Sequence, residues 1–129
     1  MVLDADGLWK LARRDRRVHE MVREEFVRMR GRLVVPWVIV IQALNEGIGV
    51  RAIDEVLARA SDAPGIDRDR AVLASRLMRV AVGNDVPDAL VASEALLAIP
   101  AIVVTSDPGD LRKLLDADPR GKRVEVWAI

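Results

Sequence analysis

The sequence has no cysteine and only one histidine, His19. The lack of cysteine excludes disulfide scaffolds, zinc ribbons, iron–sulfur sites and thiol nucleophiles, and it fits a reducing compartment. Asp4 and Asp6 follow the first three residues directly, so the N-terminus lacks the basic and apolar regions of a signal peptide. No apolar run approaches the roughly 18 residues of a membrane span. We therefore expect a cytoplasmic protein with no membrane segment.

Neither sign of charge is in excess, because 20 basic side chains balance 20 acidic ones. Non-specific coating of nucleic acid needs a broad positive excess, so any contact with RNA or DNA has to be local. Aromatic side chains are also few, which leaves little surface for stacking on bases. The chain has 129 residues, of which 51% are hydrophobic, and this is enough for one compact core. We treat residues 1–129 as a single domain.

Two common kinds of reactive site are missing. The segment Gly47-Ile48-Gly49 has neither the later glycine of a dinucleotide-binding loop nor the Gly-Lys-Ser/Thr of a P-loop. No serine sits in a nucleophile elbow, and a catalytic triad would depend on His19 within a charged amphipathic stretch. The sequence therefore argues against phosphate-cradling loops and against nucleophilic hydrolysis.

Short apolar runs alternate with amphipathic stretches along the whole chain. The pattern predicts strands at 1–3, 33–35, 101–104 and 123–127. It predicts helices at 8–30 with a break at Asp15, at 37–44 after Pro36, and at 50–60, 69–82, 85–99 and 108–115, with a loop or short edge strand at 61–67. Parallel strands need crossover connections, which helices supply. The expected class is α/β, with a parallel sheet covered by helices on both faces.

Acidic residues follow the predicted strands. Asp4 comes after the first strand, Asp107 comes after the strand at 101–104, and Asp88 lies in the first turn of the helix that begins near Asp85. Ligands of open α/β sheets bind at the carboxyl ends of the strands, so these side chains are expected to converge. Neighbouring carboxylates repel one another unless a divalent cation neutralises them. Oxygen ligands of this kind suit Mg²⁺ or Mn²⁺.

The same acids have a simpler interpretation as helix caps. Asp107-Pro108-Gly109-Asp110 has the acid, proline and second acid of a typical helix start, and Asp85 and Asp88 stand in the same relation. Asp6 has a turn interpretation. Asp4 is harder to explain in this way, because an acid at the end of a buried strand needs a partner. Capping and cation binding both stay open at this point.

Four segments together resemble the PIN-domain ribonucleases, the fold of VapC-type toxins of bacterial toxin–antitoxin pairs. They are VLDA at 2–5, LVVP at 33–36 with the helix that follows, DVPDALVA at 85–92 and VVTSDPGDL at 103–111. The last segment is the most specific of them, and the resemblance covers essentially the whole chain.

The resemblance implies a three-layer α/β/α sandwich with a mainly parallel central sheet, and metal-dependent hydrolysis of RNA phosphodiester bonds by an endoribonuclease. Its metal-binding and catalytic aspartates fall on Asp4, Asp88 and Asp107, with Asp6 and Thr105 as polar support. The cofactor would be Mg²⁺ or Mn²⁺. The expected partners are an RNA substrate, a cognate antitoxin protein and a second copy of the chain in a homodimer.

One position departs from the family pattern. The second acidic position, six residues after Pro36, holds Gln42 where the family has glutamate, and Glu46 lies one helical turn further on. An amide oxygen can coordinate a cation but brings no charge, so cation affinity falls unless Glu46, Asp85 or Asp110 compensates. The departure leaves open an alternative function, a catalytically weakened PIN-like domain that acts as a binding or regulatory module.

A basic run lies on both sides of the predicted break at Asp15. It contains Arg13, Arg14, Arg16 and Arg17, beside Lys10. These side chains could hold an RNA backbone near Asp4. Their alternative role is a solvated helix face.

A receiver-type phosphoacceptor domain is a more distant alternative, because it combines this length and class with an early aspartate pair and Mg²⁺. It would need a central strand within residues 50–82 and a lysine at a later strand end. The sequence predicts helices at 50–82 and places Lys113 within a helix.

Overall fold

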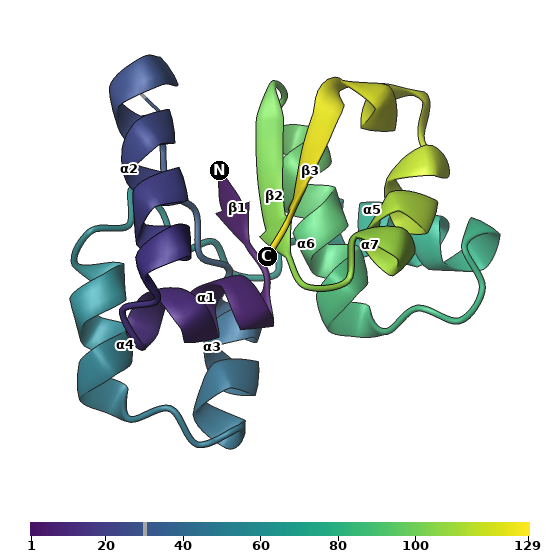
Figure 1. Ribbon diagram of the computed structural model, residues 1–129. Coiled ribbons are helices and arrows are strands. Elements are labelled where there is room, and N and C mark those ends of the chain that lie inside the picture. The colour runs from purple at the N-terminus through teal and green to yellow at the C-terminus, as the bar shows by residue number, and fades with distance from the viewer. Residues whose placement is uncertain (30) are drawn as a thin grey trace.

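The computed structural model describes residues 1–29 and 31–129, so Arg30, the last residue of the first predicted helical stretch, lies outside the described residues. Figure 1 shows the elements, which in chain order are β1 (Val2–Leu3), α1 (Ala5–Ala12), α2 (Arg16–Met29), α3 (Trp37–Asn45), α4 (Val50–Leu57), α5 (Arg68–Val80), α6 (Val86–Leu97), β2 (Ala101–Thr105), α7 (Pro108–Asp116), the 3-10 helix η1 (Pro119–Arg123) and β3 (Val124–Ala128). None of these helices has the length and apolar composition needed to cross a bilayer.

The three strands form one parallel sheet in the order β1-β2-β3. Val103 in the central strand pairs with Val2 of β1 and Val126 of β3. Because both pairings are parallel, the chain leaves β1 and β2 at the same edge of the sheet. Every residue of β2 is buried, as expected for a central strand covered on both faces. The predicted α/β class with a parallel sheet is confirmed.

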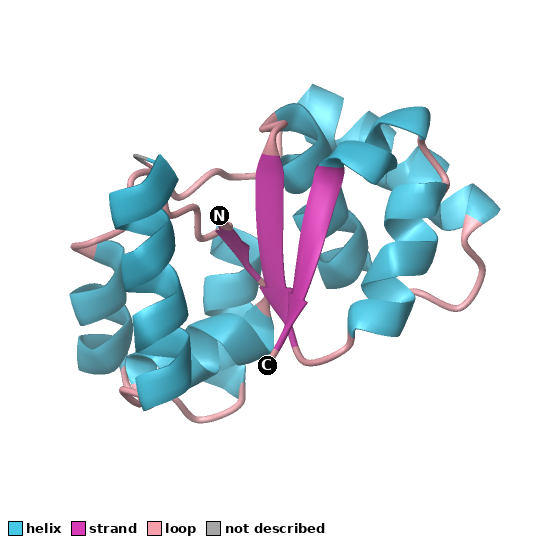
Figure 2. Cartoon of the chain, turned by 45° about the horizontal axis from the view of Figure 1, so that its top comes forward, coloured by secondary structure: helices cyan, strands magenta, loops and turns pink. Residues whose placement is uncertain are grey.

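Helices flank the sheet on two sides. In Figures 1 and 2 the strands lie between a group formed by α1–α4 and a group formed by α5–α7. Both α1 and α6 contact β1 and β2, and α7 contacts β3. Leu3, Leu8, Val91, Val103 and Leu114 are fully buried where these elements meet. Because α1 follows β1 and α7 follows β2, both helices start at the edge where these strands end.

The strand predicted at 33–35 is not a strand in the structure. Val34 instead forms single parallel bridges with Val2 and Asp62. Its amide donates a hydrogen bond to the carbonyl of Met1 at 2.8 Å. One reason lies in a distant part of the chain, because the hydroxyl of Ser61 accepts from the Leu33 amide at 3.1 Å in place of a backbone carbonyl. The proline that follows Val35 has no amide hydrogen to extend the ladder. The possible edge strand at 61–67 is likewise reduced to the bridge at Asp62.

Every predicted helix is present, and the helix ends lie within three residues of the predicted ones. The first helix begins at Ala5, three residues before the predicted start, because Asp4 caps it. The predicted break is confirmed, since the Asp15 carboxylate accepts a hydrogen bond from the Val18 amide at 3.0 Å. Residues 50–82 contain two helices and no strand, which removes the central strand that a receiver domain would need.

Candidate functional site

Asp4 connects the end of β1 to the start of α1. Its Oδ1 accepts a hydrogen bond from the Gly7 amide at 2.6 Å, and the residue is only 9% exposed. Burial raises the pKa of Asp4, whereas hydrogen bonds from the Thr105 side chain and the Gly7 amide act in the opposite direction. The buried Asp4 carboxylate therefore has the hydrogen-bond partners that it needs, in the first turn of α1 and in Thr105.

Gly7 allows α1 to approach the sheet closely. A Cβ atom at this position would lie 2.9 Å from the carbonyl oxygen of Val104 and 3.2 Å from Oδ1 of Asp4. A side chain here would push the helix away from β2. The glycine thus keeps the Asp4 carboxylate against the end of β2, and sequence patterns alone did not single it out.

Thr105, the last residue of β2, and Asp107 lie where the chain passes from β2 to α7. The buried Thr105 hydroxyl oxygen accepts a hydrogen bond from the Asp107 amide at 2.9 Å. Oδ1 of Asp107 accepts from the Asp110 amide at 3.2 Å, so Asp107 caps α7. The capping interpretation of Asp107 is confirmed. It does not remove the carboxylate from the site, because Asp107 is exposed and its second oxygen has no hydrogen bond among the described residues.

Asp88 lies at the start of α6, whose N-terminal cap is Asp85. Burial raises the pKa of Asp88 to about 6, and the charges of Asp85, Asp4, Asp107 and Asp110 add to the effect in that order. Such repulsion acts only over short distances, so these carboxylates from three separate segments share one region. They are neighbours there, whereas the sequence led us to expect that Asp4, Asp88 and Asp107 approach closely enough to share a cation.

We call this region the acidic edge and define it by six residues: Asp4, Asp6, Asp85, Asp88, Asp107 and Asp110. Within the described part of the chain, no three acidic or histidine side chains are placed to hold one metal ion. The expected approach of Asp4, Asp88 and Asp107 to bridging distance is therefore not reached. Two physical causes are visible, since Asp4 and Asp107 are each engaged by helix amides and like charges repel one another.

Gln42 lies on α3, and Glu46 caps the C-terminal end of that helix. α3 packs against α1, which Asp4 caps, and against α6, which carries Asp88. Gln42 is half-buried and Glu46 is exposed. Among the described residues, no hydrogen bond or ion pair joins either side chain to the acidic edge. The structure brings their helix to the site but leaves their role as ligands a prediction.

Two residues that the sequence analysis did not assign to the site also lie at the acidic edge. The Ser106 hydroxyl donates a hydrogen bond to Asp6, which ties the start of α1 to the end of β2. Lys113 pairs with Asp110 at 2.5 Å, measured from Nζ to Oδ1. The available signals were the position of Ser106 between two site residues and the three-residue spacing of Asp110 and Lys113 on one helix face.

The basic run is exposed, and each predicted arginine has a partner within the chain. The Arg13 guanidinium lies over the ring of Trp9, 4.0 Å from its centroid. The other partners are Glu55 for Arg14 at 3.3 Å, Glu20 for Arg16 at 2.9 Å, and the Ala128 carbonyl for Arg17 at 3.5 Å. These exposed contacts are weak, so the arginines stay available to an anionic partner.

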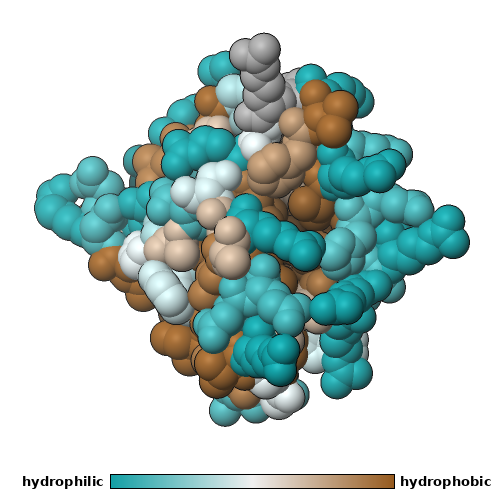
Figure 3. Space-filling model, turned by 90° about the vertical axis from the view of Figure 1, so that its left-hand side faces the viewer, coloured by the Kyte–Doolittle hydropathy of each residue, from teal (hydrophilic) through white to brown (hydrophobic). Residues whose placement is uncertain are grey.

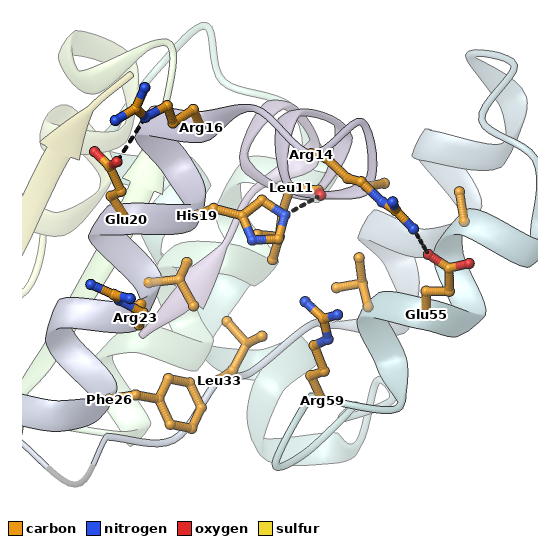
Figure 4. Close-up of a pocket in the computed structure, with 14 residues that line it drawn as sticks. Leu11, Arg14, Arg16, His19, Glu20, Arg23, Phe26, Leu33, Glu55 and Arg59 are labelled. Atoms are coloured by element: carbon orange, nitrogen blue, oxygen red, sulfur yellow. Dashed lines mark hydrogen bonds and ion pairs between the residues drawn. The ribbon is translucent and has the colours of Figure 1, made fainter.

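A groove of about 870 Å³ runs between α2 and α4. Its apolar lining is formed by Leu11, Ala12, Val22, Phe26, Leu33, Ala52 and Val56. Its charged and polar lining is formed by Arg14, Arg16, Arg23, Arg59, His19, Glu20 and Glu55. Figure 3 faces this side of the molecule and shows hydrophobic surface between projecting hydrophilic side chains. Figure 4 shows Phe26 and Leu33 across the groove from Arg59. We call this feature the arginine groove.

Comparison of the chain with protein-family models and with curated protein sequences gives no match.

Proposed function

We propose that this protein is a PIN-type endoribonuclease that depends on Mg²⁺ or Mn²⁺ and acts as the toxin of a toxin–antitoxin pair. The observation that carries the proposal is the shared environment of Asp88, where carboxylates from the starts of α1, α6 and α7 act on one half-buried acid. A purely structural arrangement of helix caps gains nothing from this repulsion. A divalent cation would relieve it. The three-layer sandwich of the PIN fold belongs to the same proposal.

The donor set of the acidic edge fits a hard cation, because it consists of carboxylate oxygens. Asp4, Asp88 and Asp107 would hold the cation. When bound, the cation supplies an activated water and stabilises the charge that develops on the leaving oxygen. The chain positions these groups itself, since Thr105 and Gly7 hold Asp4 and Asp85 holds the start of α6. One of these carboxylates would also accept the proton of the attacking water.

The arginine groove is the surface that supports an antitoxin partner. Four arginines outnumber the two glutamates among the residues that line it, and its apolar floor leaves Phe26 38% exposed. A groove with this lining fits the apolar face of an amphipathic helix that carries acidic residues along its sides. We propose that the antitoxin binds here through such a helix.

Cleavage of RNA by the purified protein tests the enzymatic proposal. We expect a single-stranded RNA to be cleaved in Mg²⁺ or Mn²⁺ and to stay intact in EDTA, and we expect Asp88→Asn to lower the rate by roughly 100-fold. Asp54→Asn, an exposed aspartate on α4, is the matched control and should keep full activity. An RNA left intact by the wild-type protein in both metals would contradict the proposal. Cation binding without cleavage would instead favour the binding module that Gln42 suggests.

Co-purification with the product of the neighbouring reading frame tests the antitoxin proposal. Phe26→Glu places a charge in the groove and should abolish co-purification. Val27→Glu is the control on the same helix, because Val27 is 81% exposed and does not line the groove. Equal capture by both variants would show that the partner does not bind here.

A further inference from the structure

Lys113 is a basic side chain at the acidic edge. Its Nζ lies 2.5 Å from Oδ1 of Asp110, and its side chain is 64% exposed. In the part of the chain that the structure describes, this is the one ion pair between a lysine or arginine and a residue of the acidic edge. Five of the six acidic residues therefore have no basic partner there.

The direction of the Lys113 side chain follows from its helix. Side chains on an α-helix lean toward the N-terminus of the helix, so Lys113 extends back over Asp110 toward the start of α7. Asp107 caps that end. The ammonium therefore lies beside Asp110 and within the influence of the Asp107 charge, and only one of its three donors is used by Asp110.

The neighbouring arginine cannot take the same place. Arg112 donates to the Asp116 carboxylate at 2.9 Å, and to the carbonyl oxygens of Gly121 and Val124 at 2.6 and 3.1 Å. These bonds hold its guanidinium against η1 and the start of β3, which lies at the opposite edge of the parallel sheet. Lys113 is thus the basic residue of α7 that faces the acidic edge.

A phosphodiester that approaches the acidic edge meets repulsion from several carboxylates. An ammonium on a flexible stem is well suited to bind a phosphate as a point charge. We propose that Lys113 is a positioning residue that holds a non-bridging phosphate oxygen of RNA beside Asp110. The inference rests on the proposed ribonuclease function and deepens it, since it names the group that counters the charge of the site.

Binding of a short fluorescein-labelled single-stranded RNA, measured by anisotropy in EDTA at several salt concentrations, tests the inference without cleavage. We expect Lys113→Gln to weaken binding about fivefold and to reduce the slope of log K against log salt by about 0.7, the value for one phosphate contact on a single strand. Lys113→Arg should restore both. Lys122→Gln, in η1 at the opposite edge of the sheet, should leave the slope unchanged.

The kinetic readout in Mn²⁺ separates positioning from structure. Lys113→Gln should raise KM and leave kcat unchanged, because the phosphate contact is made in the ground state and the transition state alike. If the wild-type protein binds and cleaves RNA and Lys113→Gln matches it in affinity, salt slope and KM, the inference is overturned and the ribonuclease proposal stands. If the wild-type protein neither binds nor cleaves RNA, the proposed function fails and the role of Lys113 fails with it.

Discussion

Asp85 both stabilises and destabilises the position of Asp88. Its Oδ1 accepts a hydrogen bond from the Asp88 amide at 3.0 Å and so caps α6. Its charge also adds to the burial that raises the pKa of Asp88 to about 6. The helix start is well formed while the carboxylate that it presents is held in an unfavourable environment. Functional sites often combine these two properties, because reactive groups there are held in environments that shift their pKa values.

Asp88→Asn is therefore expected to stabilise the folded protein near pH 8. A carboxyl whose pKa is raised on folding adds stability below its unfolded value of about 3.8 and loses it as the pH rises through about 6. The amide removes the charge, and we expect a gain of about 1 kcal/mol after allowance for solvent screening of a half-exposed group. Urea unfolding at pH 8 and at pH 4 measures this difference, which should vanish at pH 4.

Thermal unfolding of this variant with added Mg²⁺ or Mn²⁺ tests whether Asp88 binds the cation. A cation that binds only the folded chain raises its stability by mass action. The wild-type protein should melt at a higher temperature in added Mn²⁺, whereas Asp88→Asn should gain little. Equal gains in the two proteins would place cation binding away from Asp88.

Gly7→Ala is expected to destabilise the protein by about 2 kcal/mol, because overpacking against the carbonyl of Val104 forces α1 to move. Gly109→Ala is the matched control near the same edge. Its Cβ would meet Oδ1 of Asp107 at an ordinary 3.7 Å, and alanine is the better helix former, so a gain of about 0.5 kcal/mol is expected. Thermal unfolding of both variants compares them. A neutral Gly7→Ala would show that the contact with β2 is not tight.

The sequence predicted the parts of the fold that local patterns determine. Helix α6 was found from Asp85 and Pro87, and α7 from Asp107 and Pro108, because a capping acid followed by proline is a short-range signal. The run 33–35 looked like a strand for an equally good local reason. It pairs with β1 only at Val34, and its Leu33 amide donates to Ser61, which is distant in the sequence.

The candidate site shows the same division. Strand ends and parallel pairing led us to expect Asp4 and Asp107 at one edge of the sheet, with Asp88 at a helix start beside them. The contacts that set the geometry of that edge are not periodic, and they join residues far apart in the chain, such as Ser106 with Asp6. The closeness of the carboxylates depends on side-chain hydrogen bonds of this kind, and no spacing rule expresses them.

α3 presents an exposed apolar stripe, at which the expected homodimer can be tested. Trp37, Ile41 and Leu44 repeat at helical spacing and are 47%, 67% and 37% exposed. Trp9, on α1, is partly buried against the core. Ile41→Glu should convert a dimer to a monomer in light scattering, since it places a charge in the stripe. Val82→Glu, at an 86% exposed position outside α3, should leave the mass unchanged. A wild-type monomer at high concentration would contradict the dimer.

Asp118 is expected to stabilise the fold without a role in the reaction. It is 5% exposed and accepts from Arg120 and Arg76, and these partners hold the pKa of the carboxyl well below its usual range. Asp118→Asn should cost about 2 kcal/mol at pH 7. A depressed pKa contributes stability above the unfolded value of about 3.8 and loses it as the pH falls, so the two proteins should converge in strong acid.

The control for Asp118 is a second aspartate with an arginine partner. Asp116 pairs with Arg112 at 2.9 Å but is 61% exposed, so Asp116→Asn should change the free energy of unfolding by less than about 0.5 kcal/mol. Urea unfolding measures both variants, and RNA cleavage at 25 °C should be unaffected in each. A loss of cleavage in folded Asp118→Asn would give this residue a functional role after all.

Gln42 is the position where a gain of function is expected. If its amide oxygen fills a ligand position, Gln42→Glu adds a negative charge at nearly constant volume and should tighten Mn²⁺ binding and raise RNA cleavage, because cation affinity rises with ligand charge. Asp4→Asn removes a ligand charge and should have the opposite effect. Isothermal titration with Mn²⁺ and a cleavage assay measure both variants.

Glu46→Gln separates the two possible positions of the fourth ligand. Glu46 lies one helical turn beyond Gln42 and is therefore the alternative ligand at the end of α3. Loss of Mn²⁺ binding in Glu46→Gln, together with an unchanged Gln42→Glu, would assign the ligand to Glu46. If all three substitutions, including Asp4→Asn, leave Mn²⁺ affinity and cleavage unchanged, then the carboxylates at this edge serve as helix caps, and the domain is a binding module instead of an enzyme.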